Sequence, residues 1–557
     1  MGRALHFYLI GLNCRYSHSC LSLFYVRNEL KQHLPDSRVT ISQFTINDTY
    51  YDTLLRIAGS GADILCFSVY IWNATYIARL LRDLYKIQPD RRILLGGPQT
   101  PAVESLPKNC TVVDGEIEGV GTQFYHDLAQ EELEQAYKAK PGQPFRFPYR
   151  DHDFDGELKN RQVYYESSRG CPFRCSYCLS SISKGVLHKD VTVVCNELEK
   201  ILVHHPKIIK FVDRTFNDNP DRALAIWQFM AEQPGETMFH FEIAPDHFTE
   251  KMFSFLESVE PDRFQFEIGI QSTNSKTLAA INRQMDVQGA ENNIRRLVQF
   301  DSIHLHVDLI LGLPYETKES FRTSFNRVFS LQPHYIQMGL LKVLSGTALS
   351  KSAEELELVF CEQPPYQILA NRWMDHVTLS ELHAFGECVE AFYNTRYFRT
   401  IWLYLHRRNE EPFVFFTSLL EVCARHHWQD LSITQELLTR ILFDAVSERP
   451  DGKLLHELLR YDWLRCGHRF FPTFLETKSL SALRSELRKI LPQNLEGYYT
   501  YQNRNAFLKQ GVFVEMSGKA LQEVGLGETE ASRIVYFSPE QTTWVIKHGR
   551  TALVKWE

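Results

Sequence analysis

The stretch Glu166–Ser181 reads ESSRGCPFRCSYCLSS and places three cysteines within eight residues, namely Cys171, Cys175 and Cys178. Three thiolates on one tight loop can bind three irons of a 4Fe–4S cluster and leave the fourth iron open. The main alternative is a zinc site with His188 or Cys195 as fourth ligand, but zinc sites usually repeat a CxxC pair and no second pair follows. A redox disulfide would leave one cysteine unexplained, so the spacing favours a cluster.

Residues 161–350, which surround this loop, alternate between apolar, β-branched segments and segments with helical periodicity. The expected strands lie at 161–168, 207–216, 238–245, 263–272, 303–314 and 335–344. Six such repeats predict a full or partial (β/α)6-type barrel of the TIM-barrel kind, in which loops at the carboxyl ends of the strands carry the chemistry. The cysteine loop follows the first of these strands.

Residues 1–135 show the same alternation and predict an α/β domain of the flavodoxin-like, doubly wound type. Its five expected strands lie at 4–13, 39–47, 62–70, 91–97 and 111–116. Such a domain binds its ligand beyond the carboxyl ends of the strands. Residues 136–160 are polar and contain proline, so we expect a linker to the barrel there.

Residues 351–557 read as a mainly helical domain that ends in a small, hairpin-like β segment. We expect helices at 354–360 and at 366–395, among others. No motif in this part indicates a chemistry. Its surface is a candidate for closing the mouth of the barrel and selecting the substrate.

The composition is that of an ordinary globular protein, with 44% hydrophobic and 23% charged residues. The formal net charge of -7 argues against general nucleic-acid binding. The apolar runs stop short of the roughly 20 residues of a membrane-spanning helix, and the amino terminus lacks the features of a signal peptide. The 12 scattered cysteines predict reduced thiols in a cytoplasmic protein.

The segment CPFRCSYC resembles the CxxxCxΦC signature of radical S-adenosylmethionine enzymes, with Tyr177 at the aromatic position Φ. Four later segments resemble further motifs of that family in the family's order: KFVDRTFN (210–217), EIGIQS (267–272), INRQ (281–284) and DLILGLPYET (308–317). One departure stands out, because many members carry a glycine-rich GGE segment where this chain has VDRTFN. That version is similar to a subgroup with an additional amino-terminal domain.

The resemblance implies that the three cysteines ligate a 4Fe–4S cluster whose open iron takes the amino and carboxylate groups of S-adenosylmethionine. Asp213 would accept the methionyl ammonium group and Arg283 would pair with the carboxylate. The remaining candidates for this cofactor are Tyr177 at adenine, Gln271 and Ser272 at the ribose hydroxyls, and Ile310 packed on adenine. Glu242 and Glu267 are further candidates without an assigned position on the cofactor. Structural roles are the alternatives: Asp213 as a helix cap, Arg283 as a solvated residue and Ile310 as core.

A flavodoxin-like domain before such a barrel resembles the cobalamin-binding domain of cobalamin-dependent radical enzymes. The candidate contacts follow four of the strands: Asn13, Tyr16 and Ser17; Ser68, Tyr70, Trp72 and Asn73; Gly96, Gly97 and Pro98; Gly115 and Glu116. A plain turn is the alternative for Gly96–Pro98. The motif DxHxxG, which places a histidine under cobalt, is absent around His18. We therefore expect Tyr70 or Trp72 to face the cobalt.

The resemblance implies a cobalamin-dependent radical enzyme that most simply methylates an unactivated carbon, using a 5′-deoxyadenosyl radical and methylcobalamin. A flavodoxin- or ferredoxin-type protein would supply electrons, and the substrate could be a small molecule, a peptide or lipid-like. The alternatives are radical rearrangement or cyclisation, a methylthiotransferase-like enzyme whose second cluster uses Cys14, Cys66 and Cys110, and a non-catalytic sensor. Iron content separates the second cluster from the first hypothesis.

Overall fold

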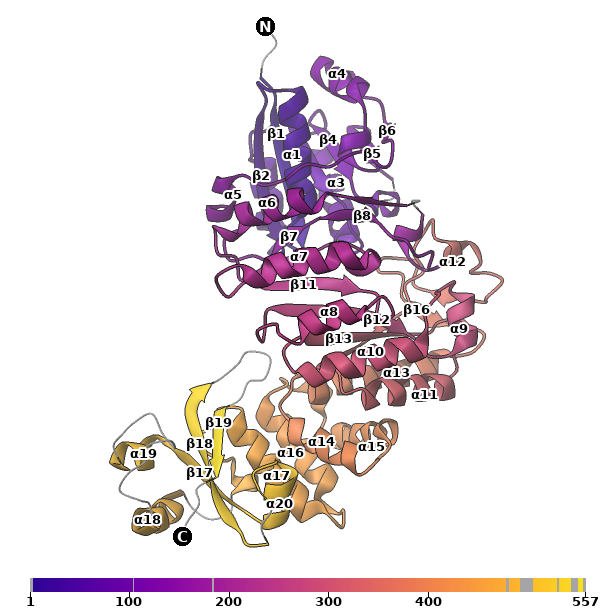
Figure 1. The fold of residues 1–557 in the computed structure, drawn as a ribbon. Coiled ribbons are helices and arrows are strands. Elements are labelled where there is room, and N and C mark those ends of the chain that lie inside the picture. Colours follow the sequence, from indigo (N-terminus) through magenta and orange to yellow (C-terminus); the bar gives the residue numbers. More distant parts are fainter. Residues whose placement is uncertain are drawn as a thin grey trace.

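The computed structural model describes residues 4–103, 105–182, 185–476, 480–490, 504–527, 530–541 and 549–553. Three parts follow one another along the chain: a domain with a parallel sheet, a second parallel sheet covered by helices, and a mainly helical region (Figure 1). The expected α/β class with parallel sheets is confirmed.

The first sheet contains six parallel strands in the order β2-β1-β3-β4-β5-β6. They are β1 (His6–Asn13), β2 (Arg38–Thr45), β3 (Ile64–Ser68), β4 (Arg92–Gly96), β5 (Cys110–Asp114) and β6 (Ala136–Lys138). Helices α1 (Leu21–His33) and α4 (Thr122–Gln130) cover one face, and α2 (Tyr50–Ala58) and α3 (Ala74–Ile87) cover the other. Because both faces are covered, central strands such as β3 are buried along their whole length.

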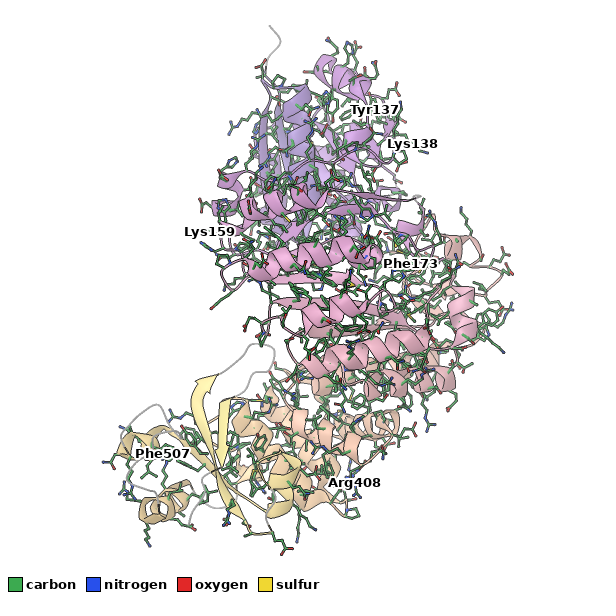
Figure 2. All side chains as sticks on the ribbon, in the orientation of Figure 1. Tyr137, Lys138, Lys159, Phe173, Arg408 and Phe507 are labelled. Carbon is green, nitrogen blue, oxygen red and sulfur yellow. The ribbon has the colours of Figure 1, made fainter. Side chains whose placement is uncertain are left out.

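The segment expected as a linker contributes to this first sheet. Residues 136–138 form the edge strand β6, which pairs in parallel with β5 and is marked in Figure 2 by Tyr137 and Lys138. A three-residue strand with exposed polar neighbours carries too little periodicity to be recognised in a sequence. The chain then passes through α5 (Asp151–Asp155), where Asp153 pairs with Arg27 of α1.

The second sheet also contains six parallel strands, in the order β14-β13-β12-β11-β10-β7. They are β7 (Val163–Tyr165), β10 (Ile208–Phe211), β11 (Met238–Ile243), β12 (Phe264–Gln271), β13 (His304–Leu311) and β14 (Tyr335–Leu340). The helices that follow the strands are α6 (Val191–Leu202), α7 (Pro220–Glu232), α8 (Glu250–Leu256), α9 (Ser275–Ala280), α10 (Val287–Phe300) and α11 (Lys318–Ser330). β7 and β14 are the two edges, so the barrel is partial.

Burial alternates along the strands of this partial barrel. On β12 the side chains of Phe264, Phe266 and Ile268 are fully buried against the helices, whereas Gln265 and Glu267 between them are only half-buried. β13 repeats the pattern. Since successive residues of a strand point to opposite faces, one face is an apolar core and the other, concave face is polar.

Each edge strand of the partial barrel receives hydrogen bonds from another part of the chain. Next to β7, the amide of Gln162 donates to the carbonyl of Ser17 at 2.7 Å, and the carbonyl of Tyr164 accepts from the Tyr149 hydroxyl. At β14, the side-chain amide of Asn394 bonds both the N–H and the C=O of Ile336, each at 2.9 Å. These bonds satisfy polar groups that an open sheet would leave unpaired.

Asn394 belongs to η5 (Glu390–Asn394), a π-helical turn at the end of helix α13 (His376–Val389). The helical region continues with α14 (Arg399–Arg407), α15 (Pro412–Arg425), α16 (Gln435–Ser447), α17 (Gly452–Arg465), α18 (Leu480–Ile490), α19 (Arg504–Gln510) and α20 (Gly518–Glu523). The expected terminal β segment is present as an antiparallel sheet of β17 (Val512–Met516), β18 (Arg533–Gln541) and β19 (Gly549–Leu553).

Two helices expected in this region are corrected by the structure. Residues 354–360 form turns and then β15 (Val359–Phe360), which pairs with β16 (Ile368–Ala370). The helix expected from residue 366 therefore begins only at His376, where Asp375 caps it by accepting from the amide of Thr378. Among the described residues, no helix has the length and apolar character needed to cross a membrane.

Replacing Arg27 by Met should lower the free energy of unfolding by about 3–5 kcal/mol, because Asp153 would keep a buried charge without its partner. The two side chains are 5% and 4% exposed and form two hydrogen bonds, of 2.5 and 2.8 Å. The matched control is Lys86→Met, since Lys86 pairs with Asp83 at the surface with 74% of its side chain exposed. That control should cost less than about 1 kcal/mol. Urea titrations of both variants measure the difference, and equal costs would contradict this assignment.

Candidate functional site

The cysteine loop lies between the short strand β8 (Ser168–Gly170) and the turn η3 (Leu179–Ser181), beyond the carboxyl end of β7. Two segments that follow other strands hold it. The sulfur of Cys171 lies 3.6 Å from the hydroxyl of Thr215, after β10, and the amide of Ser176 donates to the carbonyl of Ile281 at 2.8 Å. The loop is thus fixed at the carboxyl edge of the barrel, where catalytic loops of such barrels lie.

The donor set fits a 4Fe–4S cluster better than a single metal ion. Within the described ranges, no three side chains of His, Cys, Asp or Glu are close enough to hold one ion. Thiolates around an iron–sulfur cube each bind a different iron, so they need not converge on one point. His188, considered above as a zinc ligand, has its Nε2 3.1 Å from the carboxylate of Asp218 instead.

Arg283 lies directly beside the cysteines. Its Nη1 is 3.5 Å from the sulfur of Cys175, and its Nη2 donates to the carbonyl of Gly269 on β12. Its buried Nε has no hydrogen-bond partner within the described part of the chain. The nearby Tyr177 and Cys175 outweigh the effect of burial and raise the pKa of Arg283. A positive charge next to the cluster loop therefore retains a free donor.

A bulge in β12 places Gln271 beside this arginine. The pairing register with β13 shifts between Gly269 and Gln271, and Gln271 has a positive φ of 68°. A Cβ on Gly269 would lie 2.2 Å from the side-chain nitrogen of Gln271, so any larger residue would displace the Gln271 amide from its place beside Arg283. The structure thus brings together the expected residues Tyr177, Gln271 and Arg283.

Asp213 and Ser272 are placed differently from the expectation. Asp213 is fully buried and accepts hydrogen bonds from the amide and hydroxyl of Ser167, at 2.9 and 2.5 Å, and from the hydroxyl of Ser168 at 2.8 Å. Ser272 is also fully buried and donates to Glu316 at 3.1 Å. The structure therefore assigns both residues to holding loops in place, because their polar atoms already have partners inside the protein.

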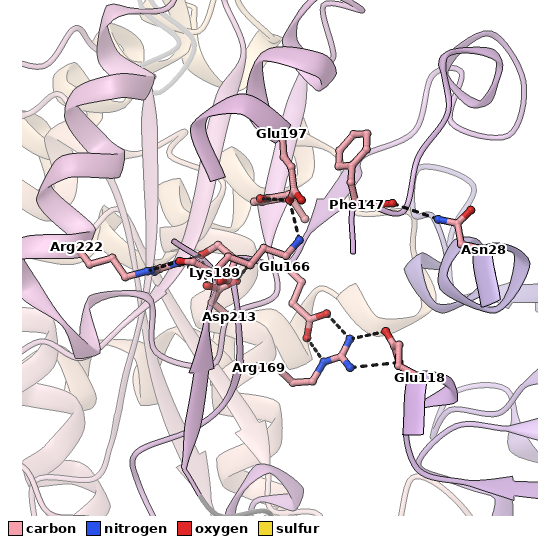
Figure 3. A network of polar contacts seen from close by, with 11 residues as sticks. Asn28, Glu118, Phe147, Glu166, Arg169, Lys189, Glu197, Asp213 and Arg222 are labelled. Carbon is pink, nitrogen blue, oxygen red and sulfur yellow. Dashed lines mark hydrogen bonds and ion pairs between the residues drawn. The ribbon is translucent and has the colours of Figure 1, made fainter. Parts of the chain in front are cut away.

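Asp213 is part of a polar network behind the cysteine loop (Figure 3). Nη2 of Arg222 donates to the carbonyl of Ser167 at 2.9 Å, and Nζ of Lys189 is 2.7 Å from the carboxylate of Glu197. Burial raises the pKa of Asp213 to about 6, against the opposing effect of the serine hydrogen bonds. The network anchors Ser167 and Ser168, where the chain passes from β7 into β8, and so orients the cysteine loop.

The concave face of the barrel carries charged residues, only some of which the sequence analysis identified. Glu267 is held by His240 at 3.0 Å and by Lys210 at 3.4 Å, which lower its pKa to about 2. Burial raises the pKa of Glu242 to about 7, although 33% of its side chain is exposed, and raises that of Asp308 far above its usual value. The polar positions in FHFE, FQFE and HLHVD were the available signal.

Ile310 shares this concave face, as expected from the alternation on β13, and is half-buried. It packs against the large apolar core that fills the space between sheet and helices. Its position at the carboxyl end of the strand is compatible with both roles considered for it.

An apolar cavity of about 210 Å³ opens at the carboxyl edge of the first sheet. Five of the expected residues line it: Ser68, Gly96, Gly97, Gly115 and Glu116. The other lining residues come largely from α1 and from the segment after β5, with Tyr25, Val26, Ile117 and Glu118 among them. Gly97 permits the turn after β4, because a Cβ there would lie 2.4 Å from the carbonyl oxygen of Val69.

The other expected contacts lie outside the cavity. Asn13 and Asn73 are buried and hold loop backbone, and Tyr16, Ser17 and Pro98 are exposed. Tyr70 and Trp72 stack on each other with ring centroids 4.5 Å apart, and Trp72 remains 43% exposed. His18 hydrogen-bonds the hydroxyl of Tyr164 at 2.6 Å through its Nδ1. The stacked pair therefore presents a flat aromatic surface on the loop after β3.

Arg169 connects this cavity to the cysteine loop, and the sequence analysis missed it. It lies two residues before Cys171, lines the cavity, and bonds both Glu166, at 2.9 and 2.8 Å, and Glu118, at 3.3 Å twice (Figure 3). All three side chains are mostly buried, at 15%, 12% and 7% exposure. One guanidinium group thus links the loop after β5 to the strand that leads into the cysteines.

The cysteines considered for a second cluster do not meet. Cys66 lies within β3, paired between Leu9 and Leu94, and Cys110 is the first residue of β5. Cys14 follows the last residue of β1. In a parallel sheet the beginning and the end of the strands form opposite edges, so Cys14 and Cys110 lie at opposite edges. The three thiols therefore do not share one edge of the first sheet.

Comparisons with known proteins agree with this geometry. Residues 165–328 match the family model described as "Radical SAM superfamily", and residues 354–514 match one described as "Protein of unknown function (DUF4080)". The barrel is thus a radical SAM domain. The second match covers most of the helical region.

Two relatives are named as methyltransferases, and one of them is cobalamin-dependent. The "Cobalamin-dependent radical SAM methyltransferase TokK" of Streptomyces tokunonensis is 26% identical over 319 residues, which is 49% of this chain and 45% of TokK. A "2-(S-pantetheinyl)-carbapenam-3-carboxylate methyltransferase" of Streptantibioticus cattleyicolor is 22% identical over 75% of this chain and 73% of its own length. The TokK alignment therefore spans less than half of that protein.

The fold itself is shared with a solved structure. The cobalamin-dependent S-adenosylmethionine radical enzyme OxsB, with aqua-cobalamin bound, superposes with a TM-score of 0.57 and 14% identity over 87% of this chain and 84% of OxsB. The chain thus carries a radical SAM domain, is homologous to cobalamin-dependent radical SAM methyltransferases, and shares its fold with OxsB over most of its length.

Replacing Cys178 by Ala should remove most of the iron from protein reconstituted with iron and sulfide, because two thiolates hold a cube weakly. The control is Cys195→Ala, a partly exposed thiol on α6. The control should keep about four iron atoms per chain. Iron quantitation on both proteins is the measurement, and equal iron contents would refute the assignment of the loop.

Proposed function

We propose that this chain is a cobalamin-dependent radical SAM enzyme that methylates an unactivated carbon of its substrate. The observation that carries the proposal is the position of the apolar cavity, which Arg169 joins to the cysteine loop. Reactive groups bound at these two places would lie at neighbouring loops of a shared site. The relatives support the same combination of cofactors.

The residues of the barrel side would act by binding and orientation. Cys171, Cys175 and Cys178 would ligate the cluster, and the free Nε–H of Arg283 would donate to the carboxylate of S-adenosylmethionine. Gln271, held beside Arg283 by the bulge, would contact the nucleoside. When bound, the cofactors supply a 5′-deoxyadenosyl radical and a transferable methyl group.

The residues of the first domain fit the parts of a cobalamin. The cavity between β1, β3, β4 and α1 has apolar walls, which suit the dimethylbenzimidazole tail, and the turn at Gly97 allows the backbone to approach it closely. Tyr70 and Trp72 would lie against the corrin ring. Because the motif DxHxxG is absent around His18, we propose that no histidine of this loop binds the cobalt.

One of the alternatives is less well supported by the arrangement, and another is compatible with it. A methylthiotransferase-like second cluster would need three thiols at one edge of the first sheet, where Cys66 and Cys110 do not lie. Rearrangement or cyclisation would use the same cofactors and differs only in the fate of the substrate radical. We further propose a cytoplasmic setting, in which a flavodoxin- or ferredoxin-type protein supplies the electrons.

The chain should form both 5′-deoxyadenosine and S-adenosylhomocysteine when it is reconstituted anaerobically with iron, sulfide and hydroxocobalamin and given S-adenosylmethionine and a strong reductant. The first product reports radical formation and the second reports methyl transfer to cobalamin. Chromatography with mass detection measures both. Formation of 5′-deoxyadenosine alone would point to rearrangement. About eight irons per chain would point to a second cluster, and the absence of both products would point to a sensor.

Replacing Arg169 by Gln should weaken cobalamin binding about tenfold or more while iron content stays at about four per chain, because Glu118 and Glu166 would lose their partner at the cavity wall. Arg161→Gln is the matched control. Arg161 lies just before β7 and also bonds the first domain, because it donates to the carbonyls of Tyr16 and His18. It does not line the cavity. Cobalamin retention after gel filtration is the readout. Unchanged retention in Arg169→Gln would contradict the proposed position of the tail.

A further inference from the structure

A second cavity, of about 320 Å³, lies at the opposite end of the barrel from the cysteine loop. It is lined by Asp301, just before β13, and by His334, just before β14, so it adjoins the amino ends of the strands. The remaining walls come from α10, α11, η5 and α14, and from the turn between the last two. The cavity therefore lies between the radical SAM domain and the DUF4080 region.

One carboxylate in this cavity is already engaged. The two oxygens of Asp301 lie 3.5 Å from Nη2 of Arg399 and 3.6 Å from Nε2 of His334. Nδ1 of His334 accepts from the amide of Leu305 at 3.1 Å, so the ring proton sits on Nε2 and faces Asp301. Burial lowers the pKa of His334, which keeps the ring neutral at physiological pH.

Arg396 is the charge in this cavity without a dedicated partner. Its Nε is buried and has no hydrogen-bond partner among the described residues, and no described contact occupies the rest of its guanidinium group. Burial and the nearby Arg399 and Arg465 lower its pKa to about 10, with Asp301 and Tyr393 acting in the opposite direction. At pH 7 the group is thus still charged, and leaving it unpaired is costly.

The rest of the cavity wall is apolar. Phe329 and Trp402 are largely buried, and Leu403 is half-buried. The indole nitrogen of Trp402 donates to the carbonyl of Phe392 at 3.0 Å, so its polar atom is satisfied and its ring is left as an apolar surface. The volume exceeds that of a single oxyanion, for which a few waters' worth of space would suffice.

We propose that this cavity binds an anionic small molecule, with its carboxylate or phosphate group on the guanidinium of Arg396 and an apolar body against Trp402 and Leu403. A planar guanidinium can donate two parallel hydrogen bonds to either head group. Because the ligand would contact the loops before β13 and β14 as well as helix α14, its binding would stabilise the junction of the two regions. The proposal is independent of cofactors in the barrel.

Saturation-transfer NMR on the full-length, anaerobically purified chain tests the proposal with phenyl phosphate, benzoate and neutral benzamide as probes. Inorganic phosphate has no carbon-bound proton to observe and is therefore added as a competitor of phenyl phosphate. Phenyl phosphate or benzoate should bind, and the stronger of the two identifies the head group. Benzamide should bind at least about tenfold more weakly than the preferred anion, because it lacks the charge. Inorganic phosphate should also bind more weakly than phenyl phosphate, because it lacks the apolar body.

Arg396→Gln should weaken binding of the preferred anion about tenfold or more, whereas Arg425→Gln, which removes an exposed arginine of α15, should leave it unchanged. Leu403→Glu provides a second variant that keeps Arg396 and places a competing carboxylate in the cavity. It should abolish binding even if Arg396→Gln fails to fold. Absence of binding by both aromatic anions, or equal binding in the wild type and Leu403→Glu, would overturn the proposal.

Discussion

The two open edges of the second six-stranded sheet, the partial barrel, are the constraint on which the rest of the structure depends. A closed barrel pairs every strand, but a partial barrel leaves β7 and β14 with unpaired backbone groups. The first domain and the segment before β7 satisfy one edge through Ser17 and Tyr149, and η5 satisfies the other through Asn394. The chain therefore has three parts because its central sheet needs a neighbour on each side.

This constraint also places the candidate site. Because the first domain covers β7, the loops at the carboxyl edge of its sheet lie next to the strand that continues into the cysteines. The single side chain of Arg169 is therefore long enough to bond both Glu118 and Glu166. The two mostly buried carboxylates are stabilised there because both bond the same guanidinium group, and removal of Arg169 would leave them uncompensated. The link favours a fixed distance between the cavity and the cluster loop.

The sequence predicted the parts of the molecule that depend on local patterns. Strand periodicity predicted both sheets, and the spacing of the cysteines favoured a cluster loop. Arg283 followed from the resemblance of INRQ to a family motif. Interactions between distant residues were not predictable, because nothing in the order of residues shows that Arg169 bonds Glu118, 51 positions away. The partners of Asp213 and Ser272 were not predictable for the same reason: their residue types suit a ligand, but the hydroxyl and carboxylate groups that they bond come from other segments.

The charge of the concave face shows why residue types alone mislead. Glu242, Glu267 and Asp308 suggest an acidic surface, yet only Glu267 has its pKa lowered, by His240 and Lys210. Burial and mutual repulsion raise the pKa of Glu242 and Asp308, which disfavours their ionised forms, whereas the pKa of Arg283 is raised and its charge is kept. The face beside the cysteine loop therefore carries less negative charge than its three carboxyl groups suggest. Such a face attracts the carboxylate of an amino-acid-like ligand, which a surface with three ionised carboxylates would repel.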